Sequence, residues 1–274
     1  MKRIELEEFF QDTKRIPGWL SFHDAAVMDG ILSHQSEDGT KGNLLEIGVY
    51  AGKSAVLLGH HLQPKEEFHV CDIFDEPTDS RNTDEILRSY KNLSRVRFEE
   101  NCNKFIGALP TIHECLSLEL PRILKDNEFR FIHIDGSHLY EHVVKDLEFA
   151  TSAIDRQKGI IAVDDFRAQH TVGVAVAVWK SILAGTLTPL VMTPAKIYLG
   201  SPDVLFDFDD MKEKLDSLEI QSVYEDILGN KTLRTFGLRD DQLYATTSKL
   251  TAFIPPIVTN LIKKSYLWKR LRNR

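Results

Sequence analysis

A glycine-rich segment at residues 44–54, Leu-Leu-Glu-Ile-Gly-Val-Tyr-Ala-Gly-Lys-Ser, constrains the fold of this 274-residue chain more than any other stretch. Its apolar run ends in two glycines four positions apart, Gly48 and Gly52, and an apolar helical pattern follows at once. This order predicts a buried strand, a tight turn and the start of a helix. Glycine lets the backbone approach a ligand at such a turn, and the N–H groups of the first helical turn then face that ligand.

Three known ligand-binding turns share this strand-to-helix form, and their glycine spacing separates them. A nucleoside-triphosphate loop needs four residues between its glycines, whereas only three lie between Gly48 and Gly52. A dinucleotide loop needs a middle glycine, which Val49, Tyr50 and Ala51 do not supply. The third form, Glu-x-Gly-x-x-x-Gly, is similar to the turn of class I S-adenosylmethionine (SAM) methyltransferases. A tight turn without a ligand remains the alternative.

Composition excludes several classes of protein. The net charge of −7 argues against a general nucleic-acid binder, and 42% hydrophobic residues are ordinary for a globular protein. No apolar run reaches 18 residues, so no membrane-spanning helix is expected. The N-terminus turns acidic where a secretion signal is apolar. Cys71, Cys102 and Cys115 lack paired spacing, which predicts free thiols and a cytoplasmic location.

From residue 44 onward, strand and helix patterns alternate. Strands are expected at residues 44–47, 68–72, 96–99, 130–135 and 159–163, followed by a hairpin of 188–192 and 196–199. Helices are expected at residues 54–61 and 81–92, after a cap at Ser137, and at 171–183. Such alternation predicts an α/β fold, with a doubly wound, mostly parallel, seven-stranded sheet. Right-handed crossovers then place each strand-to-helix turn at the carboxyl edge, where such sheets bind ligands.

The segments on either side of this core are expected to be appendages. Residues 1–43 are predicted to form a helical cap, with helices at 4–14 and after a capping box at Ser21. Residues 44–202 are predicted to be the SAM-binding core. Residues 203–274 form a C-terminal extension with a helix at 209–218 and two strands, 232–238 and 242–246, that are expected to pair.

The end of the chain differs from the rest in charge. Residues 255–274 hold six basic side chains and no acidic one, beside Tyr266 and Trp268. Such a segment can lie on an anionic membrane surface, but its basic and apolar residues do not separate on a helical wheel, which favours a solvated tail or a subunit contact. The C-terminal extension makes a homo-oligomer the expected state.

Acidic residues follow the expected strands at the ligand-binding edge. Asp72, 26 residues beyond Glu46, can accept hydrogen bonds from the ribose of an adenosine group, or it can cap a helix. Asp135 follows the fourth strand, and Asp164 and Asp165 follow the fifth. Burying three carboxylates together is costly without a cation, and an all-oxygen set favours Mg²⁺ over zinc. Each of these acids taken alone can instead cap a helix.

Residues from about 17 to 200 resemble a SAM-dependent O-methyltransferase, and more narrowly the metal-dependent group that contains macrocin and mycinamicin sugar O-methyltransferases. LLEIGVYAGKS, FIHIDGSHLYEHVVKDL and GIIAVDDF carry the resemblance. It implies that Asp135, Asp164 and Asp165 hold Mg²⁺ and that His138 is the general base. It also implies a set of SAM contacts: Glu46, Gly48, Val49, Tyr50, Gly52, Ser54, Asp72, Asn101 and Asp135. Where the family has a glycine-containing turn after its third strand, this chain has Glu100-Asn101-Cys102-Asn103.

These residue types suit methyl transfer to a hydroxyl group. A divalent cation lowers the pKa of a bound oxygen group, and a neutral imidazole with a pKa of about 6.5 can take the remaining proton. Two adjacent hydroxyls can chelate the ion, which favours a sugar, a glycosylated metabolite or a catechol as the small-molecule acceptor. The alternatives are a metal-independent methyltransferase, a nucleoside-binding protein without catalysis and a dinucleotide-dependent oxidoreductase. His138 can also orient Asp135, and His133, inside a strand, is expected to be a core residue.

Overall fold

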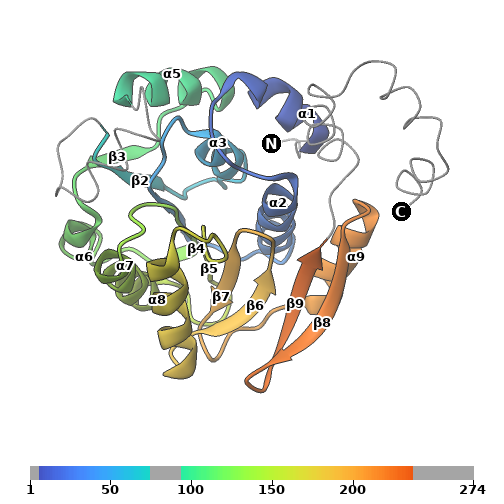
Figure 1. Ribbon diagram of the computed structural model, residues 1–274. Coiled ribbons are helices and arrows are strands. Elements are labelled where there is room, and N and C mark those ends of the chain that lie inside the picture. The colour runs from blue at the N-terminus through green and yellow to red at the C-terminus, as the bar shows by residue number, and fades with distance from the viewer. Residues whose placement is uncertain (1–5, 75–93, 237–274) are drawn as a thin grey trace, which may run out of the picture.

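A computed structural model describes residues 6–74 and 94–236, which fold around one continuous sheet (Figure 1). Its strands are β1 (Asn43–Ile47), β2 (Phe68–Asp72), β3 (Thr111–Glu114), β4 (Phe129–Ile134), β5 (Ile160–Val163), β6 (Thr188–Met192), β7 (Ile197–Gly200), β8 (Gln221–Ile227) and β9 (Asn230–Phe236). Its helices are α1 (Leu6–Asp12), α2 (Phe22–Glu37), α3 (Lys53–His60), α5 (Arg95–Phe105), α6 (Leu120–Ile123), α7 (Tyr140–Ala153), α8 (Val172–Leu183) and α9 (Phe208–Ser217), with short 3-10 helices η1 (Thr13–Arg15) and η2 (Ser117–Glu119).

The sheet confirms the doubly wound α/β prediction but has nine strands, not seven, in the order β3-β2-β1-β4-β5-β7-β6-β9-β8. The first five strands are parallel, and β7 is antiparallel to both β5 and β6. The two additional strands come from the C-terminal extension. β9 pairs with β6 on one side and with β8 on the other. Residues 242–246, which were expected to pair with 232–238, lie outside the described residues.

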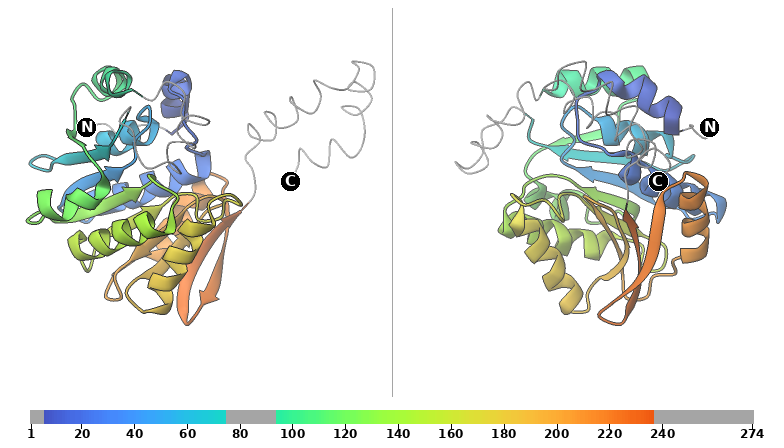
Figure 2. Two further views of the ribbon diagram at one scale, coloured as in Figure 1. Left: turned by 60° about the vertical axis from the view of Figure 1, so that its left-hand side comes forward. Right: turned by 45° about the vertical axis from the view of Figure 1, so that its right-hand side comes forward.

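Helices cover both faces of the sheet, as the turned views show (Figure 2). One apolar core joins the sheet to α1, α2, α3, α5 and α9, and a second joins it to α6, α7 and α8. The capping box predicted at Ser21 is confirmed, because the N–H of Asp24 donates to Ser21 Oγ at 3.1 Å. No helix within residues 6–74 and 94–236 has the length and apolarity needed to cross a bilayer.

The third strand was predicted at the wrong place. Residues 96–99 lie inside α5, where Phe98 and Cys102 occupy one buried helical face, and the strand beside β2 is β3, at Thr111–Glu114. β3 is a short, partly exposed edge strand, so it lacks the apolar run that identifies the central strands. Likewise, α7 begins only at Tyr140, and Ser137 accepts the N–H of Leu139 ahead of it at 3.3 Å. The helix predicted at 81–92 lies outside the described residues.

A buried ion pair fixes the edge of the sheet opposite the predicted site. Arg130, on β4, donates to both carboxylate oxygens of Glu66 at 3.0 Å, and the two side chains are 0% and 4% exposed. Arg130 also donates to Gln35 Oε1 of α2 at 3.0 Å. This arginine therefore ties α2 and the loop before β2 to the centre of the sheet.

We expect Arg130→Met to lower the free energy of unfolding by about 3–5 kcal/mol, because the carboxylate of Glu66 would remain buried without its partner. Urea denaturation of the wild type and the variant measures this difference. The matched control is Arg156→Met, which removes an exposed pair with Asp203 and should cost about 0–1 kcal/mol. Equal losses in the two variants would show that the Arg130 pair contributes no more than a surface ion pair.

Asp146, on α7, makes the free energy of unfolding depend on pH. Burial raises the pKa of its carboxyl from 3.8 to about 6, and the Ser117 side chain lowers it only in part. This pKa is higher in the folded than in the unfolded protein, so the protonated carboxyl contributes to the free energy of unfolding. That contribution is fully present below about pH 4 and is lost as the pH rises from about 4 to 6. Asp146→Asn should therefore stabilise the protein at pH 7 by up to about 3 kcal/mol and flatten this pH dependence. Chemical denaturation from pH 4 to 7 tests this, with exposed Glu148→Gln as the control.

Candidate active site

A cavity of about 340 Å³ opens at the carboxyl edge of the central strands. One part of its wall is the predicted glycine turn and the start of α3, with Gly48, Val49, Tyr50, Lys53 and Ser54. Another part is the predicted acidic edge, with Asp135, His138, Asp164 and Asp165, beside Lys196, which was not predicted. The size and mixed lining are those of a small-molecule site. The structure thus brings the two halves of the predicted site to one cavity.

The backbone at the glycine turn is fixed by the neighbouring strand. Gly48 has a φ of +83°, and a Cβ atom there would lie 2.2 Å from the carbonyl oxygen of Asp135. The N–H of Asp135 donates to the Ile47 carbonyl oxygen at 2.8 Å. Gly48 is therefore required by the close approach of β1 to the end of β4, a reason that the sequence analysis did not give.

Two residues predicted to contact the cofactor, Asp72 and Asn101, form hydrogen bonds with the backbone of the glycine turn. Asp72 accepts hydrogen bonds from the N–H groups of Val49, Tyr50 and Phe74 at 2.7, 3.2 and 2.7 Å. Asn101 Nδ2 donates to the Ala51 carbonyl oxygen at 2.8 Å. The described residues that line the cavity do not include Asp72 or Asn101. They do not include Glu46 or Gly52 either. In this structure, Asp72 and Asn101 hold the glycine turn in shape.

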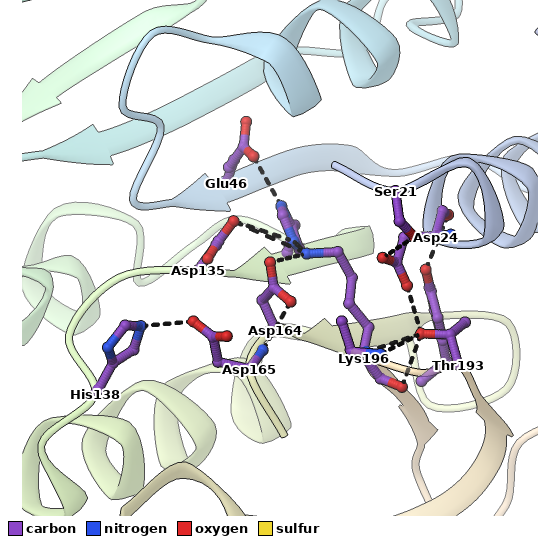
Figure 3. Close-up of polar contacts among 12 residues, drawn as sticks. Ser21, Asp24, Glu46, Asp135, His138, Asp164, Asp165, Thr193 and Lys196 are labelled. Atoms are coloured by element: carbon purple, nitrogen blue, oxygen red, sulfur yellow. Dashed lines mark hydrogen bonds and ion pairs between the residues drawn. The ribbon is translucent and has the colours of Figure 1, made fainter. Parts of the chain in front are cut away.

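A buried relay links Glu46 to Lys196 through His133. Glu46 and Lys196 are labelled in Figure 3. Glu46 Oε1 lies 2.7 Å from His133 Nδ1, and His133 Nε2 lies 2.9 Å from Lys196 Nζ. Because an ammonium group can only donate, His133 Nε2 accepts, and a neutral ring then donates its Nδ1–H to Glu46. His133 is fully buried as expected, but it also orients a charged side chain.

Lys196 lies among the predicted metal ligands (Figure 3). Its Nζ makes an ion pair with Asp164 and lies 3.9 Å from Asp135 Oδ2, and the residue is 1% exposed. Burial lowers the pKa of Lys196, but the carboxylates of Asp164, Asp135 and Asp24 outweigh that effect and raise it above its usual value. Lys196 is therefore a buried ammonium ion at neutral pH.

The two acids respond differently to this ammonium ion. Burial, followed by the charge of Asp164, raises the pKa of Asp135 well above its usual value. Burial acts in the same direction on Asp164, but contact with Lys196 overcomes it and lowers the pKa of Asp164. Asp164 is thus the ionised partner of Lys196.

A hydrogen-bonded turn between β6 and β7 holds Lys196 at this position. The N–H of Lys196 donates to Thr193 Oγ1 at 2.8 Å, and the Thr193 hydroxyl donates in turn to the Asp24 carboxylate. Tyr198 donates through its hydroxyl to the Asp24 carbonyl oxygen at 3.1 Å. The sequence analysis missed both Lys196 and this role of Asp24, because a lysine before a strand and an acid in a capping box are ordinary features of surfaces.

Asp165 and His138 form a separate pair. Asp165 Oδ2 lies 2.9 Å from His138 Nε2, and both side chains are partly accessible, at 29% and 12%. Asp165 has a φ of +55°, and its N–H donates to Asp164 Oδ1 at 2.7 Å. This turn sends the two consecutive aspartates in different directions, Asp164 toward Lys196 and Asp165 toward His138.

The predicted Mg²⁺ ligands are not gathered as one set. Among the described residues near this edge, the donor atoms that lie close enough for a single ion belong to His133, Asp135 and Asp164, without Asp165. The Lys196 ammonium already lies against this same group. A divalent cation there would meet the positive charge of the buried Lys196, which is unfavourable. The side chains as arranged do not fit Mg²⁺.

Comparisons with known proteins found one family match and several similar solved structures. Residues 45–166 match the family described as a methyltransferase domain. Among solved structures, CalS11, a calicheamicin methyltransferase, is 20% identical with a TM-score of 0.48, over 72% of this chain and 86% of its own. TomG from Streptomyces achromogenes is 14% identical with a TM-score of 0.46, over 71% and 87%. An O-methyltransferase from Bacillus cereus is 15% identical with a TM-score of 0.45, over 71% and 88%.

No curated protein matches the chain in sequence. The family match covers the glycine turn, His138 and the three aspartates of the acidic edge, which form part of the cavity wall. The sheet is mostly parallel and has helices on both faces, as in the Rossmann-like methyltransferase fold. Residues 45–166 of this core are therefore similar in sequence to a methyltransferase domain.

Proposed function

We propose that the protein transfers a methyl group from SAM to a hydroxyl oxygen of a small molecule, with His138 as the general base. The observation that carries this proposal is the 2.9 Å contact between His138 Nε2 and Asp165 Oδ2 on the wall of the cavity. An imidazole held by a carboxylate is a common arrangement for proton transfer, because the carboxylate orients the ring and stabilises its protonated form.

The glycine-turn side of the cavity fits the methyl donor. Lys53 and Ser54 belong to the first turn of α3 and line the cavity beside Gly48. Backbone N–H groups at a helix start and a nearby ammonium favour a carboxylate, such as that of the methionine part of SAM. When bound, SAM supplies an electrophilic methyl group on a sulfonium centre.

The His138 side of the cavity then serves the acceptor. As the oxygen–carbon bond forms, the carbon–sulfur bond breaks with its electron pair on sulfur, and the hydroxyl proton moves to the His138 imidazole. Asp165 stabilises the resulting imidazolium, and the cavity walls hold the two reactants in contact. His138 and Asp165 thus remove the hydroxyl proton of the acceptor, which a solvent base would do poorly near neutral pH.

The mouth of the cavity favours an acceptor with a ring. Trp19 is 66% exposed and stacks on Tyr50 with ring centroids 5.5 Å apart, and both residues line the cavity. An aromatic surface of this kind packs well against the flat face of a sugar or of another aromatic ring. We propose a sugar, a glycosylated metabolite or a catechol as the acceptor class.

The test uses SAM with a deuterated methyl group and a panel of acceptors that carry hydroxyl, amine or carboxylate groups. Mass spectrometry is expected to find the labelled methyl group only on hydroxyl oxygens of ring-containing acceptors. SAM binding in a calorimeter without transfer to any acceptor would instead favour a nucleoside-binding protein without catalysis. Transfer only to amines or carboxylates would contradict the proposed acceptor group.

A further inference from the structure

We propose that the Lys196 ammonium is the permanent cation of this site and replaces the Mg²⁺ that the sequence resemblance implies. The inference rests on the proposed methyl transfer for its catalytic meaning, but its main test is a binding measurement that does not depend on activity. It makes Lys196 a positioning residue, since it acts through Asp135 and Asp164.

The sheet register places the lysine opposite the acids. β5 and β7 are antiparallel, and Val163 pairs with Ile197. Asp164 directly follows Val163 and Lys196 directly precedes Ile197, so the two residues lie opposite each other. From there, the ammonium contacts Asp164 directly and lies 3.9 Å from Asp135 Oδ2 and 2.9 Å from His133 Nε2. One cation thus reaches each residue that could ligate an ion at this point.

The surroundings are built to keep this ammonium in place. Glu46 fixes the His133 ring so that Nε2 accepts a hydrogen bond from Lys196. At the other end of the side chain, Thr193 accepts the N–H of Lys196, and its own N–H donates to the Lys196 carbonyl oxygen at 2.9 Å. Withdrawal of the lysine would leave the buried His133 and the partly accessible carboxylates of Asp135 and Asp164 without their positive partner.

The arrangement also removes the reason for a metal. The sequence argument for Mg²⁺ was that several carboxylates buried together need a compensating positive charge. Lys196 provides that charge within the chain. Asp165, which the resemblance implies as a third ligand, is engaged with His138 at 2.9 Å. The acidic edge is therefore complete without an added ion.

The test measures Mn²⁺ binding to the full chain after treatment with EDTA, by calorimetry and electron paramagnetic resonance. We expect no saturable binding at this site in the wild type. Lys196→Met removes the charge but keeps the side-chain volume, so we expect one Mn²⁺ per chain to bind, and Asp164→Asn added to this variant should abolish the binding. Lys158→Met, which removes an accessible lysine paired with the single carboxylate of Asp38, is the control and should bind no Mn²⁺.

Activity gives a second readout. Methyl transfer by the wild type should be unchanged by EDTA, whereas Lys196→Met should lose about 10²-fold in rate, because a preorganised charge is removed. Wild-type protein that binds one Mn²⁺, and loses it in Asp164→Asn, would overturn the inference even if Lys196→Met did not fold. A folded Lys196→Met protein with the wild-type rate in EDTA would overturn it as well. Absence of transfer in the wild type, with no Mn²⁺ bound, would count against the proposed function and not against the role of Lys196.

Discussion

Replacing Gly48 by alanine is expected to prevent the domain from folding. The added Cβ would lie 2.2 Å from the Asp135 carbonyl oxygen and 2.7 Å from the Gly136 Cα, so the clash is with backbone directly after the adjacent strand β4. Relief would require β1 and β4 to separate at the centre of the sheet, where Asp135 N–H donates to Ile47 and Gly48 N–H donates to Cys71. We expect a cost above about 5 kcal/mol, which is most or all of the stability of an ordinary domain.

Gly107 provides the matched control for this substitution. Its φ of +77° is close to that of Gly48, but nothing lies within 4 Å of a Cβ built there. Gly107→Ala should therefore lower the free energy of unfolding only by the backbone strain, about 1–2 kcal/mol. Circular dichroism and urea denaturation compare the two variants with the wild type. Equal stability of the two would show that the close approach of β1 to β4 does not require glycine.

Replacing His138 by alanine is expected to lower the rate of methyl transfer by about 10²–10⁴-fold, the usual contribution of a general base. Binding of SAM should change little, because the glycine turn and α3 supply the other part of the cavity wall. The loss should appear in kcat at saturating acceptor, measured with labelled SAM, while calorimetry gives the SAM affinity.

His142 is the matched control for His138. It lies four residues further along, in α7, where its Nδ1 is 2.9 Å from Ser137 Oγ. It is not among the described residues that line the cavity. His142→Ala should keep a rate close to that of the wild type. A His138→Ala protein with the wild-type rate would assign the base to another group, and His138 would then have only the alternative role of a positioning residue.

The sequence was sufficient to predict the centre of the fold. β1, β4 and β5 are short, mostly apolar runs with acids or glycines directly after them. Because parallel strands end at one edge, the positions of Asp135, Asp164 and His138 in one cavity followed from this pattern. The edge strand β3 did not, since half-exposed residues in a four-residue strand leave no periodic signal.

The function of Lys196 could not be predicted in this way. It depends on the antiparallel register of β5 and β7, which sets residue 196 beside residue 164, and no local pattern encodes that register. The same limit explains why the contacts of Asp72 and Asn101 with the glycine turn could not be predicted. In the folded turn, their side chains form hydrogen bonds with backbone groups, and no local sequence pattern indicates these contacts.

The crystal structure of the protein with S-adenosylhomocysteine, the demethylated product, tests most directly whether this cavity holds the methyl donor. We expect its density against Gly48, Val49 and Tyr50, with the sulfur atom turned toward the side of the cavity formed by His138 and Asp165. Density at another place on the molecule, with the glycine turn and the His138–Asp165 pair left without ligand, would contradict the proposed site.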